Sequence, residues 1–166
     1  MKLADLHRFA VQRPRLLLDT VPLTVLMVGM IDPRLIGQAN RTQTYDQGHF
    51  TALAHLWKVY SEFSAQVLTT AHVLTETSNF LGHLGGRHKR EGRAKLAHFV
   101  ANAKERQVRA RDLIESRPYF ELGITDTAIH EAADKRTLVV TGDGPLAGHL
   151  ATTGAEVILL RSFHMT

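Results

Sequence analysis

Short apolar runs alternate with helix-like segments along this chain, and this alternation limits the folds open to it more than any other feature. Four of the runs read as buried strands, at 15–19, 66–69, 137–141 and 156–160. Strands that alternate with helices are typical of a parallel sheet covered by helices on both faces. The sequence therefore predicts an α/β fold, a three-layer α/β/α sandwich around a central parallel sheet. Since no repeat or linker divides residues 1–166, we expect a single domain.

Helical patterns and helix-boundary residues fill the intervals between the strands. Pro22 suits the first turn of a helix, Asp46 suits a cap, and Gly85 with Gly86 would break a helix. We expect helices over 22–30, 46–60, 71–84, 91–106, 126–135 and 145–153, the fifth of them capped by Thr125 or Asp126. Residues 33–46 are polar and rich in turn-forming residues, which predicts a surface loop.

The chain has no cysteine, which excludes disulfides, thiolate metal sites and cysteine nucleophiles and fits a reducing cytoplasm. The longest apolar stretch, 21–31, is too short to span a bilayer. Residues 1–15 carry scattered charges and lack the apolar core of a secretory signal. We therefore expect a cytoplasmic location and no membrane partner.

Positive charge is concentrated between residues 87 and 111. This segment holds nine Lys or Arg and two Glu, in a chain whose net charge is +4. A basic arm on an otherwise slightly acidic body suits a polyanion such as RNA. A solvated helix whose charges serve solubility would give the same pattern. Under the first interpretation, the nucleic-acid-binding residues are Arg87, Lys89, Arg90, Arg93 and Lys95.

Four acidic residues that are far apart in the sequence fall where an α/β fold brings chain segments together. They are Asp19, Glu76, Asp126 and Asp143. Ligands bind at the carboxyl ends of the strands in an open parallel sheet, and Asp19 and Asp143 each follow a strand. Clustered carboxylates repel one another unless a cation lies between them. Each residue also has an ordinary interpretation as a helix cap, a turn residue or a surface charge. Asp19 is the hardest of the four to explain by such an ordinary interpretation, because an ionised aspartate after three leucines needs a compensating partner.

Hard oxygen ligands in a chain without cysteine favour Mg²⁺ or Mn²⁺ over Zn²⁺. The ten histidines include no helical pair with a third ligand, which also argues against zinc. A carboxylate site of this kind would hold a phosphodiester and orient an attacking water. The residues expected to support the carboxylates through hydrogen bonds are Thr20, Asn79 and Thr141.

Four strings, taken in order, resemble a PIN domain: LLLDTVPL at 16–23, TAHVLTETSNFL at 70–81, GITDTAIHEAA at 123–133 and VVTGDGPLAGHLATTGAEVILL at 139–160. The resemblance covers about 15–160 and implies the sandwich fold and a Mg²⁺- or Mn²⁺-dependent endoribonuclease. It implies that the catalytic, metal-binding acids are Asp19, Glu76, Asp126 and Asp143. Many bacterial members are VapC-type toxins that cleave RNA, are held inactive by an antitoxin and commonly dimerise through early helices. An RNA substrate, an antitoxin partner and a homodimer are therefore implied as well.

The chain departs from the family at Val21, where PIN domains commonly have Asn after Asp-Thr. Loss of that amide is expected to weaken or alter the activity while leaving the carboxylates in place. It leaves open a second hypothesis, a catalytically impaired PIN module that binds RNA or a protein. A third hypothesis is a phosphotransfer enzyme with Asp19 as nucleophile, as in haloacid-dehalogenase-like phosphatases. Those enzymes need a second Asp where this sequence has Val21.

Overall fold

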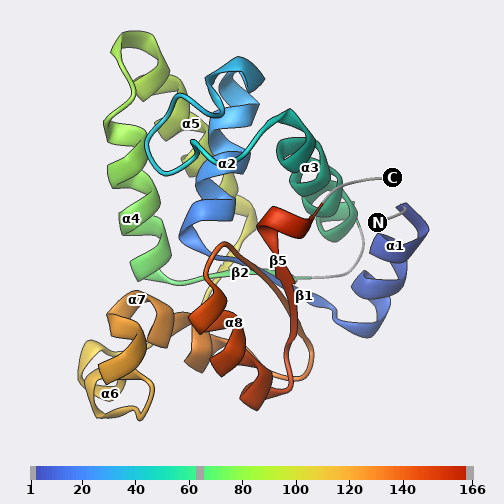
Figure 1. Cartoon of the computed structure of the whole chain (residues 1–166), viewed down its shortest axis with the longest axis vertical. Coiled ribbons are helices and arrows are strands. Elements are labelled where there is room, and N and C mark those ends of the chain that lie inside the picture. The colour runs from blue at the N-terminus through green and yellow to red at the C-terminus, as the bar shows by residue number, and fades with distance from the viewer. Residues whose placement is uncertain (1–2, 63–65, 164–166) are drawn as a thin grey trace.

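Five parallel strands form one sheet at the centre of the computed structural model, which describes residues 3–62 and 66–163 (Figure 1). The strand order is β3-β2-β1-β4-β5. The bounds are β1 Arg15–Leu18, β2 Gln66–Thr69, β3 Lys104–Glu105, β4 Thr137–Thr141 and β5 Glu156–Leu159. In register, Leu17 of β1 lies between Leu68 of β2 and Val139 of β4. The order reverses beside β1, so the chain crosses from one side of the sheet to the other at this strand.

Helices cover both faces of the sheet, as the sequence predicts for an α/β/α sandwich. Figure 1 shows α2, α3, α4 and α5 on one side of the strands, and α7 and α8 on the other. The bounds are α1 Leu3–Gln12, α2 Thr20–Ile31, α3 Gln47–Glu62, α4 Ala71–Gly82, α5 Gly86–Asn102, α6 Ala110–Glu115, α7 Tyr119–Ala132 and α8 Gly144–Leu150. Short 3-10 turns occupy Pro33–Leu35, Ala151–Thr153 and Leu160–Ser162.

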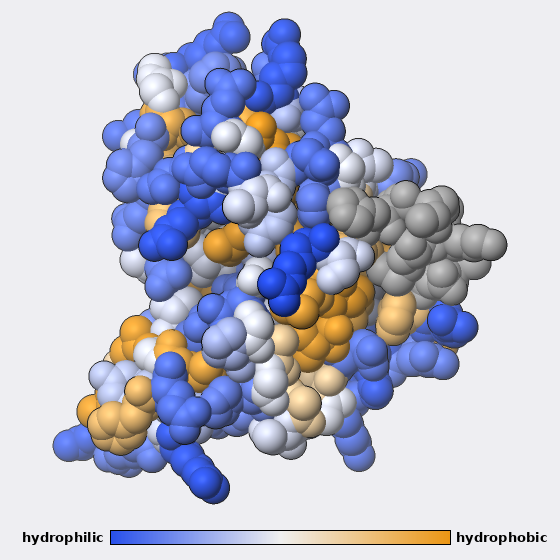
Figure 2. All heavy atoms as spheres, in the orientation of Figure 1, coloured by the Kyte–Doolittle hydropathy of each residue, from blue (hydrophilic) through white to orange (hydrophobic). Residues whose placement is uncertain are grey.

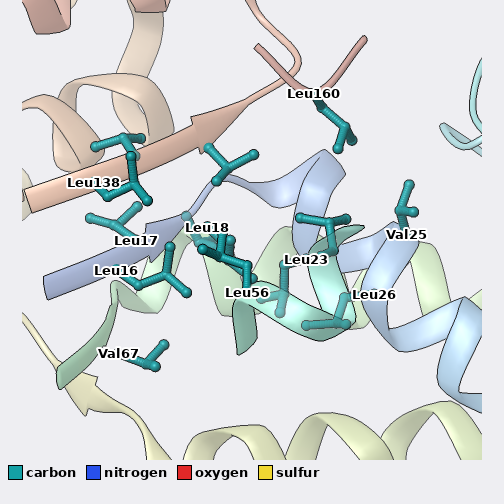
Figure 3. Packing of buried hydrophobic residues seen from close by; sticks show 14 of the residues in the cluster. Leu16, Leu17, Leu18, Leu23, Val25, Leu26, Leu56, Val67, Leu138 and Leu160 are labelled. Atoms are coloured by element: carbon teal, nitrogen blue, oxygen red, sulfur yellow. The ribbon is translucent and has the colours of Figure 1, made fainter. Parts of the chain in front are cut away.

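The core is built around β1, β4 and the helix α2. Every residue of β4 is buried, and nine residues of α2 are buried, because this helix packs against α3, α4 and α5 as well as the sheet. Figure 3 shows leucines of β1 facing apolar side chains of α2 and Leu56 of α3. The apolar stretch at 21–31 therefore forms the central helix α2, which is hydrophobic on all sides because other elements cover it on several faces. No helix in the described part of the chain is both long and apolar enough to cross a membrane.

Two boundaries differ from those that the sequence predicts. The predicted helix over 126–135 corresponds to the part of α7 that follows Gly123, whose φ of 77° and ψ of −179° are not helical; α7 as a whole begins earlier, at Tyr119, and ends at Ala132. The predicted helix at 91–106 is shifted, since α5 begins at Gly86 and ends at Asn102. The chain then forms the exposed edge strand β3, whose two charged residues lack the apolar signature of an inner strand.

Candidate functional site

All four predicted acids line one open pocket, with a cavity volume of about 610 Å³, at the carboxyl ends of β1 and β4. The start of α2, the helix α4, the kinked part of α7 and the turn before α8 form its walls. The segment 41–45 closes a further side. Figure 2 shows this face of the molecule hollowed between α4 and α7, with hydrophilic atoms above and apolar atoms over α6 and α7 below. The sheet topology thus brings together residues that are up to 124 positions apart in the sequence, as the interval from 19 to 143 shows.

Asp19 forms the floor of the pocket, where it follows β1 and caps α2. Only 6% of its surface is exposed. One carboxylate oxygen accepts a hydrogen bond from the Thr20 N–H at 2.5 Å, and the other accepts one from the Thr141 hydroxyl at 2.7 Å. Burial raises the pKa of Asp19, as do the carboxylates of Asp143 and Glu76, while the two hydrogen bonds act in the opposite direction. The floor of the pocket is therefore a carboxyl group that the fold holds in one orientation, in surroundings that disfavour its ionised form.

Glu76 is a half-buried residue of α4 that connects three elements. Its Oε2 atom accepts a hydrogen bond from the Thr20 hydroxyl at 3.0 Å, and its Oε1 atom accepts one from the Thr125 hydroxyl at 2.6 Å. These two bonds join α4 to the first residue of α2 and to α7. Because both oxygens have a donor from a different element, the orientation of this carboxylate is determined by the tertiary fold.

Asp126 lies on α7, just after the kink at Gly123, and is half-buried in the pocket wall. Burial, followed by the nearby carboxylates of Asp19, Asp143 and Glu76, raises its pKa to about 7. This carboxyl group therefore experiences the negative charge of all three of its predicted partners. A cation in the pocket would relieve that repulsion and favour the ionised form.

Asp143 is exposed and caps α8. Its Oδ1 atom accepts a hydrogen bond from the Leu146 N–H at 2.8 Å, and its own N–H donates to the Thr141 hydroxyl at 2.9 Å. Thr141 therefore contacts two of the four acids, one through its donor and one through its acceptor. Asp143, which the sequence alone would allow as an ordinary turn residue, is the N-cap of α8 and lines the pocket at the same time.

The oxygen ligands of the four acids suit a hard cation, but the four side chains are not close enough together to bind one in the present arrangement. Within residues 3–62 and 66–163, no three His, Cys, Asp or Glu side chains are gathered closely enough to hold a metal ion. The donor set is nevertheless made entirely of carboxylate and hydroxyl oxygens, which Mg²⁺ and Mn²⁺ prefer. Asp19, Glu76 and Asp143 are each held by hydrogen bonds, so metal binding would require the carboxylates to move closer together.

Two of the three residues predicted to support the acids contact them, and the third does not line the pocket. Thr20 and Thr141 donate hydrogen bonds to Glu76 and Asp19, as the sequence suggests. Asn79 is exposed and does not line the pocket. The predicted nucleic-acid-binding residues all lie on α5, outside the pocket, and all but the half-buried Lys89 are exposed: Arg87, Lys89, Arg90, Arg93 and Lys95.

Several pocket residues were missed by sequence reasoning. Thr125 was considered only as a helix cap, although its hydroxyl donates to Glu76 across the pocket. The segment 33–46 was predicted as a surface loop, yet it supplies Arg41, Gln43, Thr44 and Tyr45 to the pocket lining. Neither contribution has a periodic or motif signal, because both depend on how distant segments pack.

Comparison with protein-family models, with curated proteins and with solved structures finds no match for this chain. The resemblance to PIN domains therefore stays a prediction.

Proposed function

We propose that this protein is a metal-dependent endoribonuclease of the PIN type, which hydrolyses RNA phosphodiesters in the acidic pocket. The observation that carries the proposal is that Asp19, Glu76, Asp126 and Asp143 line one pocket at the carboxyl ends of parallel strands. Four carboxylates destabilise a fold unless they serve a ligand that needs them. A divalent cation with a phosphodiester is the ligand that most directly meets that requirement.

Each acid has a distinct part in this proposal. Asp19 would be the principal ligand of Mg²⁺ or Mn²⁺, because Thr141 and the Thr20 N–H fix its orientation. Asp126, on α7, and Asp143, at the start of α8, would complete the site. Glu76, fixed by Thr20 and Thr125, would ligate directly or hold a water molecule in position. When bound, the ion would supply positive charge at the phosphoryl oxygens and lower the pKa of a coordinated water.

The helix α5 supports RNA as the substrate through charge alone. Its exposed Arg87, Arg90 and Arg93 would attract a polyanion without reading sequence. The resemblance further suggests an antitoxin partner, a homodimer and a cytoplasmic location.

A second candidate is a catalytically impaired module that binds RNA or a protein without cutting. Val21 favours it, because this residue lines the pocket where the family commonly has an amide, and the acids are not drawn together as tightly as a metal site requires. Phosphotransfer through Asp19 as nucleophile is less well supported, because this carboxylate is buried and both of its oxygens already accept hydrogen bonds.

A cleavage assay separates the two candidates. Pooled labelled RNAs and single-stranded DNA would be incubated with Mg²⁺, Mn²⁺ or EDTA, using wild type, Asp126→Asn and Asp112→Asn. Asp112 is a matched control, because this exposed aspartate pairs with Arg109 outside the pocket. We expect metal-dependent cutting that falls at least about 100-fold in Asp126→Asn alone. RNA binding without cleavage by the wild type under either metal would favour the impaired module.

A further inference from the structure

Arg41 stands apart from the other residues of the acidic pocket. It is the sole basic side chain among the described residues that line this pocket, and it is exposed. It comes from the loop between the 3-10 turn Pro33–Leu35 and α3, whereas the acids come from the sheet ends and from α4 and α7. The pocket therefore has an acidic floor and one cationic position on its rim.

The guanidinium of Arg41 is held by an aromatic ring and not by a carboxylate. Its central carbon lies 5.7 Å from the ring centroid of Phe80, which also lines the pocket. Within residues 3–62 and 66–163, no ion pair joins Arg41 to an acidic side chain, although four acids line the same pocket. Cation–π contact leaves the N–H donors at the guanidinium edge available for another anion.

The backbone at Arg41 is strained in a way that a solubility role would not explain. With φ at 69°, Arg41 is the single non-glycine residue with positive φ in the described part of the chain. This conformation is uncommon for a residue with a long side chain, and such strain is concentrated at functional sites. The next residue, Thr42, is fully buried, and its hydroxyl and N–H both donate to the Ala39 carbonyl. A fixed turn therefore directs Arg41 to the pocket.

We propose that Arg41, braced by Phe80, binds a phosphodiester of a single-stranded nucleic acid at the mouth of the acidic pocket. The inference rests on the proposed function and specifies its substrate class. A phosphodiester approaching four carboxylates is repelled, and a bidentate guanidinium on the rim offsets that repulsion.

The shape of the pocket favours a single strand over a duplex. The acidic floor is recessed, as the low exposure of Asp19 shows, so a strand has to leave its stack to reach it. The part of the wall that α7 contributes offers apolar surface from Leu122 and Ile124, on which an unstacked base can rest. Such a base contact beside one cationic side chain needs a strand whose bases are already unstacked, which a duplex does not offer.

The test measures binding without cleavage. Fluorescence anisotropy of a short labelled single-stranded RNA, the same sequence as single-stranded DNA, and its RNA duplex would be recorded in EDTA over a range of salt concentrations. The variants are Arg41→Ala, Arg41→Lys and, as a charge-matched control on the surface outside the pocket, Arg117→Ala. Circular dichroism and melting curves would verify that each variant is folded.

We expect Arg41→Ala to weaken single-strand binding about 5- to 10-fold and to reduce the slope of log K against log salt by about 0.7, which corresponds to one phosphate contact. Arg41→Lys should keep the slope while losing part of the affinity, because Lys keeps the charge but not the planar fork. Arg117→Ala should change the affinity less than about twofold. Duplex binding should respond weakly to Arg41→Ala.

Unchanged affinity and salt slope in a folded Arg41→Ala protein would overturn the inference, as would an equal loss for the duplex. The outcome is separable from that of the nuclease proposal. If wild type cuts RNA but Arg41→Ala binds and cuts normally, the subsite is wrong and the nuclease stands. If wild type cuts nothing yet Arg41→Ala loses binding, the subsite stands and the nuclease fails.

Discussion

The hydroxyl of Thr141, at the end of β4, donates a 2.7 Å hydrogen bond to the carboxylate of Asp19, at the end of the neighbouring strand β1. Both side chains are buried, and the same hydroxyl oxygen accepts the N–H of Asp143. Two adjacent strand ends are thus linked through one hydroxyl group that contacts two acids. This hydrogen bond favours the ionised form of Asp19, whereas burial and the neighbouring carboxylates raise its pKa and oppose ionisation.

Replacement of Thr141 by Val should therefore destabilise the protein in a pH-dependent manner. At about pH 8 we expect a loss of about 2 kcal/mol in the free energy of unfolding, because a buried carboxylate loses a donor. The loss should shrink at about pH 4, since the hydrogen bond lowers the pKa of Asp19 and thus favours the ionised form over the protonated one. Urea unfolding at both pH values measures the difference.

Thr24→Val provides the matched control for that experiment. Thr24 is equally buried, and its hydroxyl donates to the Thr20 carbonyl within α2 at 2.7 Å, away from any carboxylate oxygen. The loss in the free energy of unfolding caused by Thr24→Val should be about the same at both pH values. Equal pH dependence for the two variants would contradict the interpretation of Thr141 as the group that stabilises the ionised form of Asp19.

Asp126→Asn should stabilise the metal-free protein at neutral pH and above. The pKa of Asp126 is about 7 in the folded protein against a usual value of 3.8, so the folded state binds more protons than the unfolded state between those values. The free energy of unfolding of the wild type therefore falls as the pH rises through this window. Since Asp126 is half-exposed, solvent screening reduces the effect, and we expect a gain of about 1 to 2 kcal/mol for the variant at about pH 8.

The advantage of Asp126→Asn should vanish toward about pH 4, where the wild-type carboxyl group is protonated in the folded protein. Thermal unfolding in EDTA across the pH range measures it. Asp112→Asn is the control, because the pKa of Asp112 is lowered by Arg109 and its loss should not stabilise the protein at any pH. A variant that is no more stable than wild type at about pH 8 would show that the acids repel one another less than their arrangement suggests.

Divalent cations should stabilise the wild type and not its pocket variants. If Mg²⁺ or Mn²⁺ binds the folded state alone, a concentration of one hundred times Kd raises the free energy of unfolding by about 2.7 kcal/mol. We expect a higher melting temperature with Mn²⁺ than with EDTA for wild type and Asp112→Asn, and a much smaller rise for Asp19→Asn and Asp126→Asn. An equal rise in all four proteins would indicate cation binding elsewhere on the surface.

Much of this fold could be predicted from the sequence because four of the five described strands are apolar runs with polar ends. The strands β2 and β4 lie where the runs at 66–69 and 137–141 place them, and β1 and β5 differ by one residue. Buried parallel strands have a distinct composition, since helices cover both of their faces. The edge strand β3 was missed, because two exposed charged residues carry no such signal.

The acidic part of the pocket could be predicted for a related reason, and the rest could not. Asp19 and Asp143 follow strands, and ligand sites in parallel sheets lie at that end. The rim depends on tertiary packing: Arg41 enters through a loop without periodicity, and Thr125 reaches Glu76 across two helices. Functional residues on loops rarely show a periodic sequence pattern that would predict their position in a site.

Gly29→Ala tests the packing of the central helix that positions the pocket floor. A methyl group at Gly29 of α2 would lie 2.2 Å from Cδ2 of Phe50 on α3, which is too close for two carbon atoms. Since these two helices contact each other in the core, the ring or the helix has to shift, and we expect a loss of about 1 to 3 kcal/mol in the free energy of unfolding.

Gly148→Ala, in α8, is the matched control, because nothing lies within 4 Å of the added carbon and helix propensity alone should stabilise the protein by up to about 1 kcal/mol. The double variant Gly29→Ala with Phe50→Leu should recover part of the loss, since the ring that clashes is gone. If Gly29→Ala were as harmless as Gly148→Ala, the close approach of α2 and α3 would not be a determinant of this core.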